Sequence, residues 1–240
     1  MIPRLRVIAG PNGSGKTTLA SRLAADYAVN FYHFLNADLL LAELLKSGKT
    51  TCPFPTADEE LMDFVRNTSY ASEYKRPFLD GEIAISSEEH LTFSPSSINS
   101  YTVAMVCDFF KEQYLSRRLS FSFETVFSHP AKLAMLQKAQ SAGYRTYLYF
   151  VATEDPAINI DRISSRVALK GHDVPEEKTR ERYTRCLNQV NQALPFLNRA
   201  FFFDNSGDHQ LFLAEYESPG RLLLHSDVLP VWFRRYVLGE

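Results

Sequence analysis

The sequence lacks several features that mark specialised classes of protein. Its 240 residues include three cysteines and no Cys-x-x-Cys pair, which argues against a disulfide framework and favours reduced thiols in the cytoplasm. No apolar run approaches the roughly 20 residues that span a bilayer. The chain runs directly into a predicted strand, so we expect neither a membrane segment nor a signal peptide. The formal net charge of −2 argues against general affinity for nucleic acid or a membrane surface.

What the sequence does contain is a phosphate-binding motif near its N-terminus. Residues 10–17, GPNGSGKT, fit G-x-x-x-x-G-K-[ST]. A predicted buried strand at 5–9 precedes the motif and a helical pattern follows it, which is the context that the motif needs. In such a loop, backbone N–H groups surround a phosphate, Lys16 reaches the β- and γ-phosphates, and Thr17 helps to hold Mg²⁺. A plain glycine turn is the alternative, but a turn needs neither the lysine nor the threonine. The predicted ATP-binding residues here are Gly10, Pro11, Asn12, Gly13, Ser14, Gly15, Lys16, Thr17 and Thr18.

Two carboxylates follow predicted strands elsewhere in the chain. Residues 31–35 and 121–123 are predicted as strands, and Asp38 and Glu124 come just after them. Open parallel sheets bind ligands at the carboxyl ends of their strands, so we expect both side chains to face the phosphate loop. Asp38 is suited to accept a hydroxyl proton during phosphoryl transfer. The alternatives are that Asn36 or Asp38 caps the following helix, and that Glu124 pairs with a nearby arginine.

Arginines gather in two predicted helices within residues 155–194, joined by a turn at 170–175. Arg162 and Arg166 share one face of the first helix, and Arg182 lies near the start of the second. A positioned arginine can contribute about 10³–10⁵ in the rate of phosphoryl transfer. We therefore expect this region to form a lid that carries arginines to the phosphates. The alternative is a solvated helical face. The neighbouring charged residues are Asp161, Glu176, Glu177, Arg180, Glu181 and Arg185.

The chain as a whole is predicted to be one α/β domain over 1–240, with a mainly parallel five-stranded sheet flanked by helices. Proline and glycine punctuate residues 47–97, which we interpret as a helical insertion that covers the acceptor site. Its aromatic residues could stack on a ligand or pack internally. Residues 208–240 are predicted as a C-terminal hairpin and helix without a chemical role. The aromatic residues of the insertion are Phe54, Tyr70, Tyr74 and Phe78.

Together these pieces resemble the zeta toxin family of kinases. The matching segments follow one another over about residues 5–206: AGPNGSGKTT at 9–18, NAD at 36–38, SFET at 122–125, RV at 166–167, GHDVPE at 171–176, RY at 182–183 and DNS at 204–206. The resemblance implies a P-loop kinase fold, ATP with Mg²⁺ as phosphoryl donor, Asp38 as base and Glu124 in the acceptor pocket. It also implies that Arg162 or Arg166, with Arg180 or Arg182, contacts the ATP phosphates.

Zeta toxins phosphorylate a hydroxyl of UDP-N-acetylglucosamine, so the resemblance implies a small sugar-nucleotide acceptor. Because the family is one of toxins, the resemblance also implies an antitoxin protein as partner. Two departures leave details open. The insertion at 47–97 falls where acceptor-binding parts are expected, and His172 stands where the larger toxins carry an arginine.

The sequence thus predicts a cytoplasmic ATP-dependent kinase that acts on a small hydroxyl acceptor, and it leaves two alternatives. A nucleoside, nucleotide or RNA-end kinase would share the architecture. A polynucleotide acceptor requires a basic track with aromatics, so the balanced charge argues against nucleic acid. An ATP-binding switch or interaction protein would hydrolyse ATP slowly and need no acceptor.

Overall fold

The computed structural model describes residues 2–87, 90–168 and 174–240. The chain divides into two compact units. We call Met1–Phe34 together with Arg118–Glu240 the core unit, and Leu35–Arg117 the inserted unit. In the part of the chain that is described, no helix has both the length and the apolar character needed to cross a membrane.

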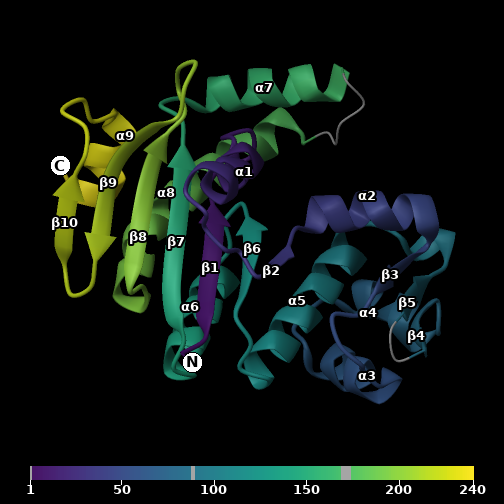
Figure 1. Cartoon of the computed structure of the whole chain (residues 1–240). Helices are drawn as coiled ribbons and strands as arrows, with labels where there is room; N and C mark the ends of the chain where they lie inside the picture. Colours follow the sequence, from purple (N-terminus) through teal and green to yellow (C-terminus); the bar gives the residue numbers. More distant parts are fainter. Residues whose placement is uncertain (1, 88–89, 169–173) are drawn as a thin grey trace. The chain divides into compact units, whose positions relative to one another are not determined.

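The core unit is built on a mixed β-sheet (Figure 1). Its strands are β1 (Arg4–Ala9), β2 (His33–Leu35), β6 (Phe121–Thr125), β7 (Arg145–Ala152), β8 (Arg199–Asp204), β9 (Leu211–Glu217) and β10 (Arg221–Leu224). Among the described residues the sheet has seven strands, in the order β10-β9-β8-β7-β1-β6-β2. Strand β1 runs parallel to β6 and β7, and β7 runs parallel to β8. The parallel strands therefore end together at one edge, where ligands bind in this class of sheet.

The predicted number of five strands is wrong. The five predicted strands are present, and the described residues add β9 and β10 beyond β8. These two strands form the C-terminal hairpin, which the sequence predicted as a separate element. They pair antiparallel, β9 with β8 from Arg199↔Glu217 to Asp204↔Leu211, and β10 with β9. An exposed edge of β8 would leave backbone N–H and C=O groups unpaired, and the hairpin pairs them.

Helices cover the two faces of the sheet because β7 alternates its apolar side chains between them. Tyr149 and Val151 pack with Leu19 of α1 (Lys16–Asp26), whereas Phe150 contacts Trp232 near the C-terminus. The other helical elements are α6 (Ala131–Ser141), α7 (Pro156–Ala168), α8 (Glu176–Ala193), the 3₁₀ turn η2 (Leu194–Phe196), α9 (Val231–Phe233) and the π-helical turn η3 (Arg234–Leu238). Figure 1 shows α1 in front of the sheet and α6 and α8 behind it.

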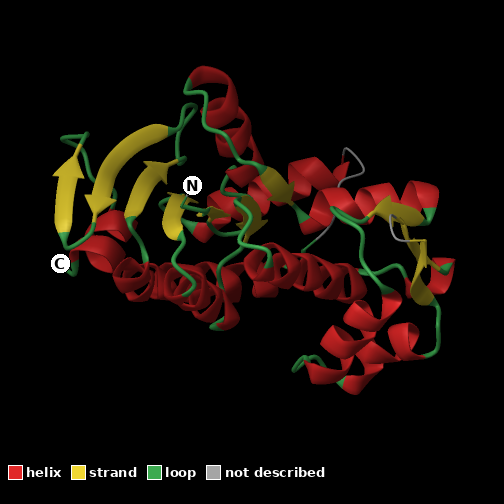
Figure 2. Ribbon diagram, turned by 60° about the horizontal axis from the view of Figure 1, so that its bottom comes forward, coloured by secondary structure: helices red, strands yellow, loops and turns green. Residues whose placement is uncertain are grey.

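The inserted unit combines helices with a small antiparallel sheet, visible as short arrows in Figure 2. Its elements are α2 (Ala37–Ser47), β3 (Lys49–Thr51), α3 (Asp58–Asn67), α4 (Ser72–Leu79), β4 (Ile83–Ser87), β5 (His90–Phe93), the 3₁₀ turn η1 (Pro95–Ser97) and α5 (Ser100–Ser116). Its described strands lie in the order β3-β5-β4. The sequence predicted helix in this region but none of these strands, because segments such as KTT and HLTF are too short to show a clear alternation.

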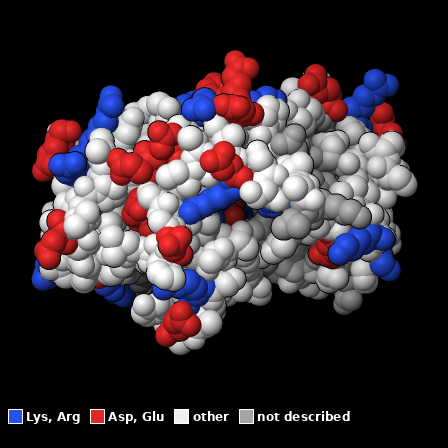
Figure 3. Space-filling model, turned by 90° about the horizontal axis from the view of Figure 1, so that it is seen from above, with Lys and Arg blue, Asp and Glu red and all other residues white. Residues whose placement is uncertain are grey.

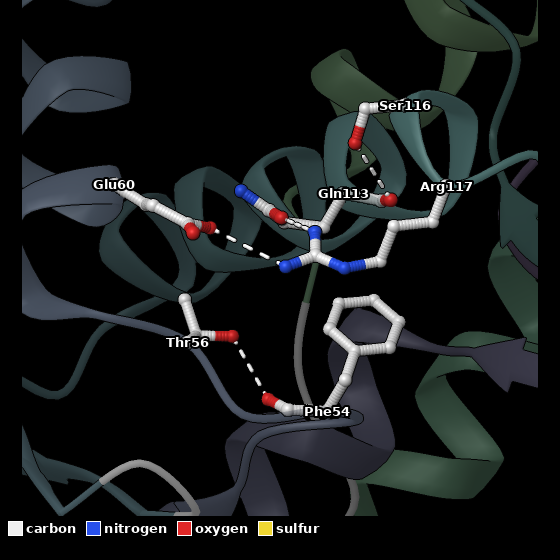
Figure 4. Close-up of polar contacts among 6 residues, drawn as sticks. All are labelled: Phe54, Thr56, Glu60, Gln113, Ser116 and Arg117. Carbon is white, nitrogen blue, oxygen red and sulfur yellow. Dashed lines mark hydrogen bonds and ion pairs between the residues drawn. The ribbon is translucent and has the colours of Figure 1, made fainter.

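One end of the inserted unit is held by an arginine that lies on an aromatic ring (Figure 4). The Arg117 guanidinium lies 4.4 Å from the centroid of the Phe54 ring, and that ring meets Tyr114 edge-on at 5.2 Å. Arg117 also donates to Gln113 of α5 and lies 3.5 Å from the Glu60 carboxylate of α3. The arginine therefore joins the end of α5 to α3 and to the segment that carries Phe54.

The other predicted aromatic residues of the insertion also have internal partners. The Tyr70 hydroxyl donates to Asp108 Oδ2 at 2.8 Å. Tyr74 stacks on Tyr101 with ring centroids 4.2 Å apart, and Phe78 is buried. These contacts favour the packing interpretation of the aromatic residues over ligand stacking.

Candidate active site

The predicted phosphate loop forms a tight glycine turn between β1 and α1. The backbone φ angles are +153° at Gly10, +76° at Gly13 and +92° at Gly15, a region that residues with side chains rarely adopt. Space is also limited, because a Cβ atom on Gly10 would lie 2.0 Å from the Val151 carbonyl oxygen of the neighbouring strand. Glycine is therefore required both by the backbone conformation and by the close approach of β7.

The start of α1 has the character of an anion site. Gly15 precedes the helix in a left-handed conformation, without a side-chain cap and without an acidic residue in the first turn. By contrast, the side chains of Asn36 and Asn99 cap α2 and α5. Lys16 is 8% exposed, and its Nζ donates to the Pro11 carbonyl at 2.8 Å, so the ammonium group lies against the loop. These features fit a phosphate bound by the loop.

Thr17 in the first turn of α1 and Glu124 near the carboxyl end of β6 come together beside the loop. Strand β6 pairs with β1 in a register that sets Glu124 opposite Ile8. The Thr17 hydroxyl donates toward the Glu124 carboxylate, with its Oγ1 at 3.2 Å from Oε1 and 3.0 Å from Oε2. A hydroxyl beside a carboxylate next to a phosphate loop supplies the oxygen ligands that Mg²⁺ prefers. The structure therefore gives Glu124 a threonine partner that the sequence analysis did not foresee.

Asp38 lies in the first turn of α2, in the inserted unit, and its side chain is exposed. The cap of this helix is Asn36, whose Oδ1 accepts from the backbone N–H groups of Asp38 and Leu39 at 2.9 and 3.2 Å. Of the two capping alternatives, the structure selects Asn36. The Asp38 carboxylate is thus available for another role.

The predicted lid arginines differ in their contacts. Arg162 of α7 donates to the carbonyls of Asn205 and Gly207 at 2.7 and 3.4 Å. Arg166 is exposed on the same helix, and Arg182 on α8 is partly buried. Arg180 and Arg185 form ion pairs with Glu176 and Glu181 at 2.8 and 3.2 Å, as expected for a solvated helical face. Gly171 and His172 of the predicted turn lie outside the described residues.

Helix α8 is tied to the end of β7 by a buried tyrosine. The Tyr183 hydroxyl donates to the carbonyls of Thr153 and Glu154 at 2.6 and 3.1 Å. Burial raises the pKa of Tyr183, so the hydroxyl keeps the proton that it donates. This contact fixes the helix segment that carries Arg182.

Sequence reasoning missed a set of amide side chains around the phosphate loop. Asn159, Asn205 and Gln210 each donate to a carbonyl of the loop. No motif identifies them, because an asparagine or glutamine that supports a loop has no characteristic spacing. The residues at 204–207 were predicted to form a turn that borders the nucleotide base, without a contact between Asn205 and the loop.

A glycine loop of this pattern between the first strand and the first helix of a mainly parallel sheet defines the P-loop class of α/β folds. Within this class, the Zeta toxin family model matches residues 98–215 of the chain. The resemblance predicted from the sequence is thus confirmed, and the chain is zeta-toxin-like.

Solved structures support the fold. One chain of the AvrRxo1-ORF1:AvrRxo1-ORF2 complex with ATP superposes with a TM-score of 0.54 at 14% identity, over 93% of this chain and 61% of that chain. A structure of the PezAT chromosomal toxin–antitoxin system of Streptococcus pneumoniae has a TM-score of 0.52 at 12% identity, over 100% of this chain and 80% of that chain. The chain therefore spans about three fifths of the AvrRxo1 chain. A search of curated protein sequences finds no match.

Proposed function

We propose that the protein is an ATP-dependent kinase that transfers the γ-phosphate to a hydroxyl group of a small acceptor. The observation that carries this proposal is the glycine loop with Lys16 against it and Thr17 beside Glu124. The likeness to the zeta toxin family supports it, and so does a neighbour of the same fold whose structure was solved with ATP.

The donor side of the reaction is assigned to the core unit. The loop N–H groups and Lys16 bind the β- and γ-phosphates and neutralise charge that develops during transfer. Thr17 holds Mg²⁺ through its hydroxyl. Because Glu124 lies beside that hydroxyl, we assign its carboxylate to the magnesium side of the site, in addition to the acceptor role that the resemblance implies.

The acceptor side is assigned to the inserted unit. Asp38 acts as the base that takes the proton of the acceptor hydroxyl, and its freedom from the capping role supports this assignment. Residues 47–97 bind or cover the acceptor. A UDP-sugar is the first acceptor to test, because UDP-N-acetylglucosamine is the acceptor of zeta toxins.

The lid at 155–194 supplies the remaining positive charge. We assign Arg182 rather than Arg180 to the ATP phosphates, since Arg180 pairs with Glu176, and we assign Arg166 as the resemblance implies. Arg166→Ala should therefore lower the rate of phosphoryl transfer while the melting temperature stays near that of the wild type. The tail at 208–240 completes the sheet and has no assigned chemistry.

A nucleoside or nucleotide kinase of the same architecture is the second candidate. An RNA-end kinase is disfavoured by the distribution of charge. On the one face seen from above, Figure 3 shows acidic side chains among the basic ones, and the formal net charge of the chain is −2, whereas a polynucleotide acceptor requires a basic track. An ATP-binding switch that hydrolyses ATP slowly is the third candidate, and it differs by needing no acceptor.

The proposal extends to a protein partner and a compartment. The AvrRxo1 neighbour is a complex of two gene products, and the PezAT neighbour is a toxin–antitoxin system. We therefore propose an antitoxin protein as partner. The three cysteines are buried free thiols, which fits the reducing cytoplasm.

The deciding experiment incubates the protein with γ-labelled ATP and either a metabolite extract or UDP-N-acetylglucosamine. We expect label to appear in a phosphorylated acceptor, and Lys16→Ala to abolish its formation. Lys138→Ala removes an exposed lysine of α6 and should leave it unchanged. Label found only in free phosphate would favour the switch. Labelled product from Lys16→Ala would make the loop a structural turn.

A further inference from the structure

We infer that the phosphate loop is held in its binding conformation by the side-chain amides of Asn159, Asn205 and Gln210, and that Arg162 acts through Asn205 rather than on a phosphate. This inference rests on the proposed ATP site. The three amide residues are then positioning residues, which act on ATP through the loop. Arg162, which the sequence predicted to contact ATP, is also a positioning residue in this inference.

The amides reach consecutive parts of the loop from outside the motif. Asn159 Nδ2 on α7 donates to the Asn12 carbonyl at 2.6 Å. Asn205 Nδ2, just after β8, donates to the Ser14 carbonyl at 2.8 Å. Gln210 Nε2, just before β9, donates to the Gly15 carbonyl at 3.1 Å. We call these three contacts the amide clamp.

The amide clamp fixes which way the loop peptides face. A peptide whose carbonyl is bound by an outer side chain turns its N–H away from that side chain, and the phosphate-binding loop needs its N–H groups directed at the ligand. The clamp also explains Gly15 in a way that φ alone does not. A Cβ on Gly15 would lie 2.4 Å from Asn205 Nδ2 and 3.1 Å from Gln210 Nε2, so a side chain would displace the amides.

The amide of Asn159 is itself fixed. Asn159 is fully buried, and its Oδ1 accepts a hydrogen bond from the Thr153 hydroxyl. That contact leaves the Nδ2 end directed at the loop. Gly13 packs on the same residue, because a Cβ there would lie 2.6 Å from the Asn159 carbonyl oxygen. Loop and helix α7 therefore fit against each other at this point.

Arg162 holds the segment that carries Asn205. Its guanidinium donates to the Asn205 and Gly207 carbonyls, as described above. The same segment is tied to β7 by the Asn205 N–H, which donates to the Ala152 carbonyl at 2.8 Å. The Glu154 N–H donates to the Ser206 hydroxyl at 2.7 Å. The turn after β8 is thus anchored to the sheet, and Arg162 is engaged with it.

The test is the dissociation constant of Mg²⁺·ATP, measured by isothermal titration calorimetry on the whole chain. Loss of one neutral hydrogen bond corresponds to about a five- to tenfold change. We expect Asn205→Ala and Gln210→Ala each to weaken ATP binding by about that factor. Gln140→Ala is the matched control, since this amide donates to the Pro195 carbonyl at 3.1 Å in the core unit. It should bind ATP as the wild type does.

The role of Arg162 is tested by a double-mutant cycle. If Arg162 acts through Asn205, the double variant Arg162→Ala/Asn205→Ala should bind ATP within about twofold of the weaker single variant. If Arg162 instead contacts a phosphate, the two losses should multiply, and that result would overturn this part of the inference.

A conservative replacement separates positioning from simple packing. Asn205→Leu keeps the approximate size without a donor, whereas Asn205→Gln keeps an amide. Positioning predicts that Gln recovers part of the ATP affinity and Leu does not, while both keep a melting temperature near that of the wild type. Unchanged ATP binding in Asn205→Leu and Gln210→Ala would sink the amide clamp. If the wild type itself fails to bind ATP, the proposed function fails instead.

Discussion

Replacing Thr17 by valine tests the magnesium end of the proposed site. The Thr17 hydroxyl lies 3.0 and 3.2 Å from the two Glu124 carboxylate oxygens. Valine keeps the β-branched shape of threonine and removes only the hydroxyl. A hydrogen bond to a charged group contributes about 1.5–3 kcal/mol, so its loss corresponds to a factor of about 10–100. Because Thr17 is exposed, we expect the fold to survive the change.

The measurement is the initial rate of ADP formation over a series of Mg²⁺ concentrations at fixed ATP. Thr17→Val should raise the half-saturating Mg²⁺ concentration by about the factor given above and lower the maximal rate. Thr17→Ser keeps the hydroxyl and should restore most of both. An unchanged Mg²⁺ dependence in the valine variant would refute the assignment. So would an equal defect in the serine variant, since the hydroxyl would then not be the cause.

Three further changes test other parts of the molecule. Asp38→Asn should bind ATP with unchanged affinity yet transfer phosphate at least tenfold more slowly, as expected for loss of a general base; equal turnover rates would remove Asp38 as the base. Burial raises the pKa of Tyr144 to about 12, whereas an unfolded tyrosine titrates near 10, so the stability that Tyr144 contributes is complete below about pH 10 and falls as the pH rises toward 12. Urea unfolding at pH 9 and 11 should show that the free energy of unfolding falls less between these two pH values in Tyr144→Phe than in the wild type. Arg117→Ala should lower the free energy of unfolding by about 1 kcal/mol through its contact with the Phe54 ring; Arg76→Ala, which breaks an exposed pair, should change it by less than about 0.5 kcal/mol, and equal effects would contradict the ring contact.

The sequence was informative where the chemistry requires a fixed residue at a fixed spacing. The phosphate loop could be predicted because its glycines, Lys16 and Thr17 must all be present and must lie between a strand and a helix. The parallel strands and the helices around them followed from long apolar patterns, such as residues 145–152 of β7. For such elements, local sequence and final structure agree because the same residues determine both.

The rest depended on contacts between distant segments. Strand β9 pairs with the edge strand β8, and β10 pairs with β9. The residues of the hairpin alone do not determine which strand of the sheet it pairs with. The amide clamp joins positions up to 195 residues apart in the chain. Arg162 was assigned to ATP from its place among arginines, while its contacts with the turn after β8 became visible only in the structure.

The two units carry different parts of the proposed reaction, and this division limits what the family likeness implies. The loop, Glu124 and the amide clamp all lie in the core unit, whereas Asp38 and residues 47–97 lie in the inserted unit. The Zeta toxin match covers residues 98–215, so it includes Glu124 and leaves out the phosphate loop, Asp38 and 47–97. Likeness to zeta toxins therefore bears on Glu124 and the lid, whereas the ATP site rests on the motif and geometry of the loop, and neither of them fixes the acceptor. It follows that substitutions within 47–97 should change which compound gains the label and leave the affinity for ATP unchanged. Loss of ATP binding on such substitutions would show that the two roles are not separable.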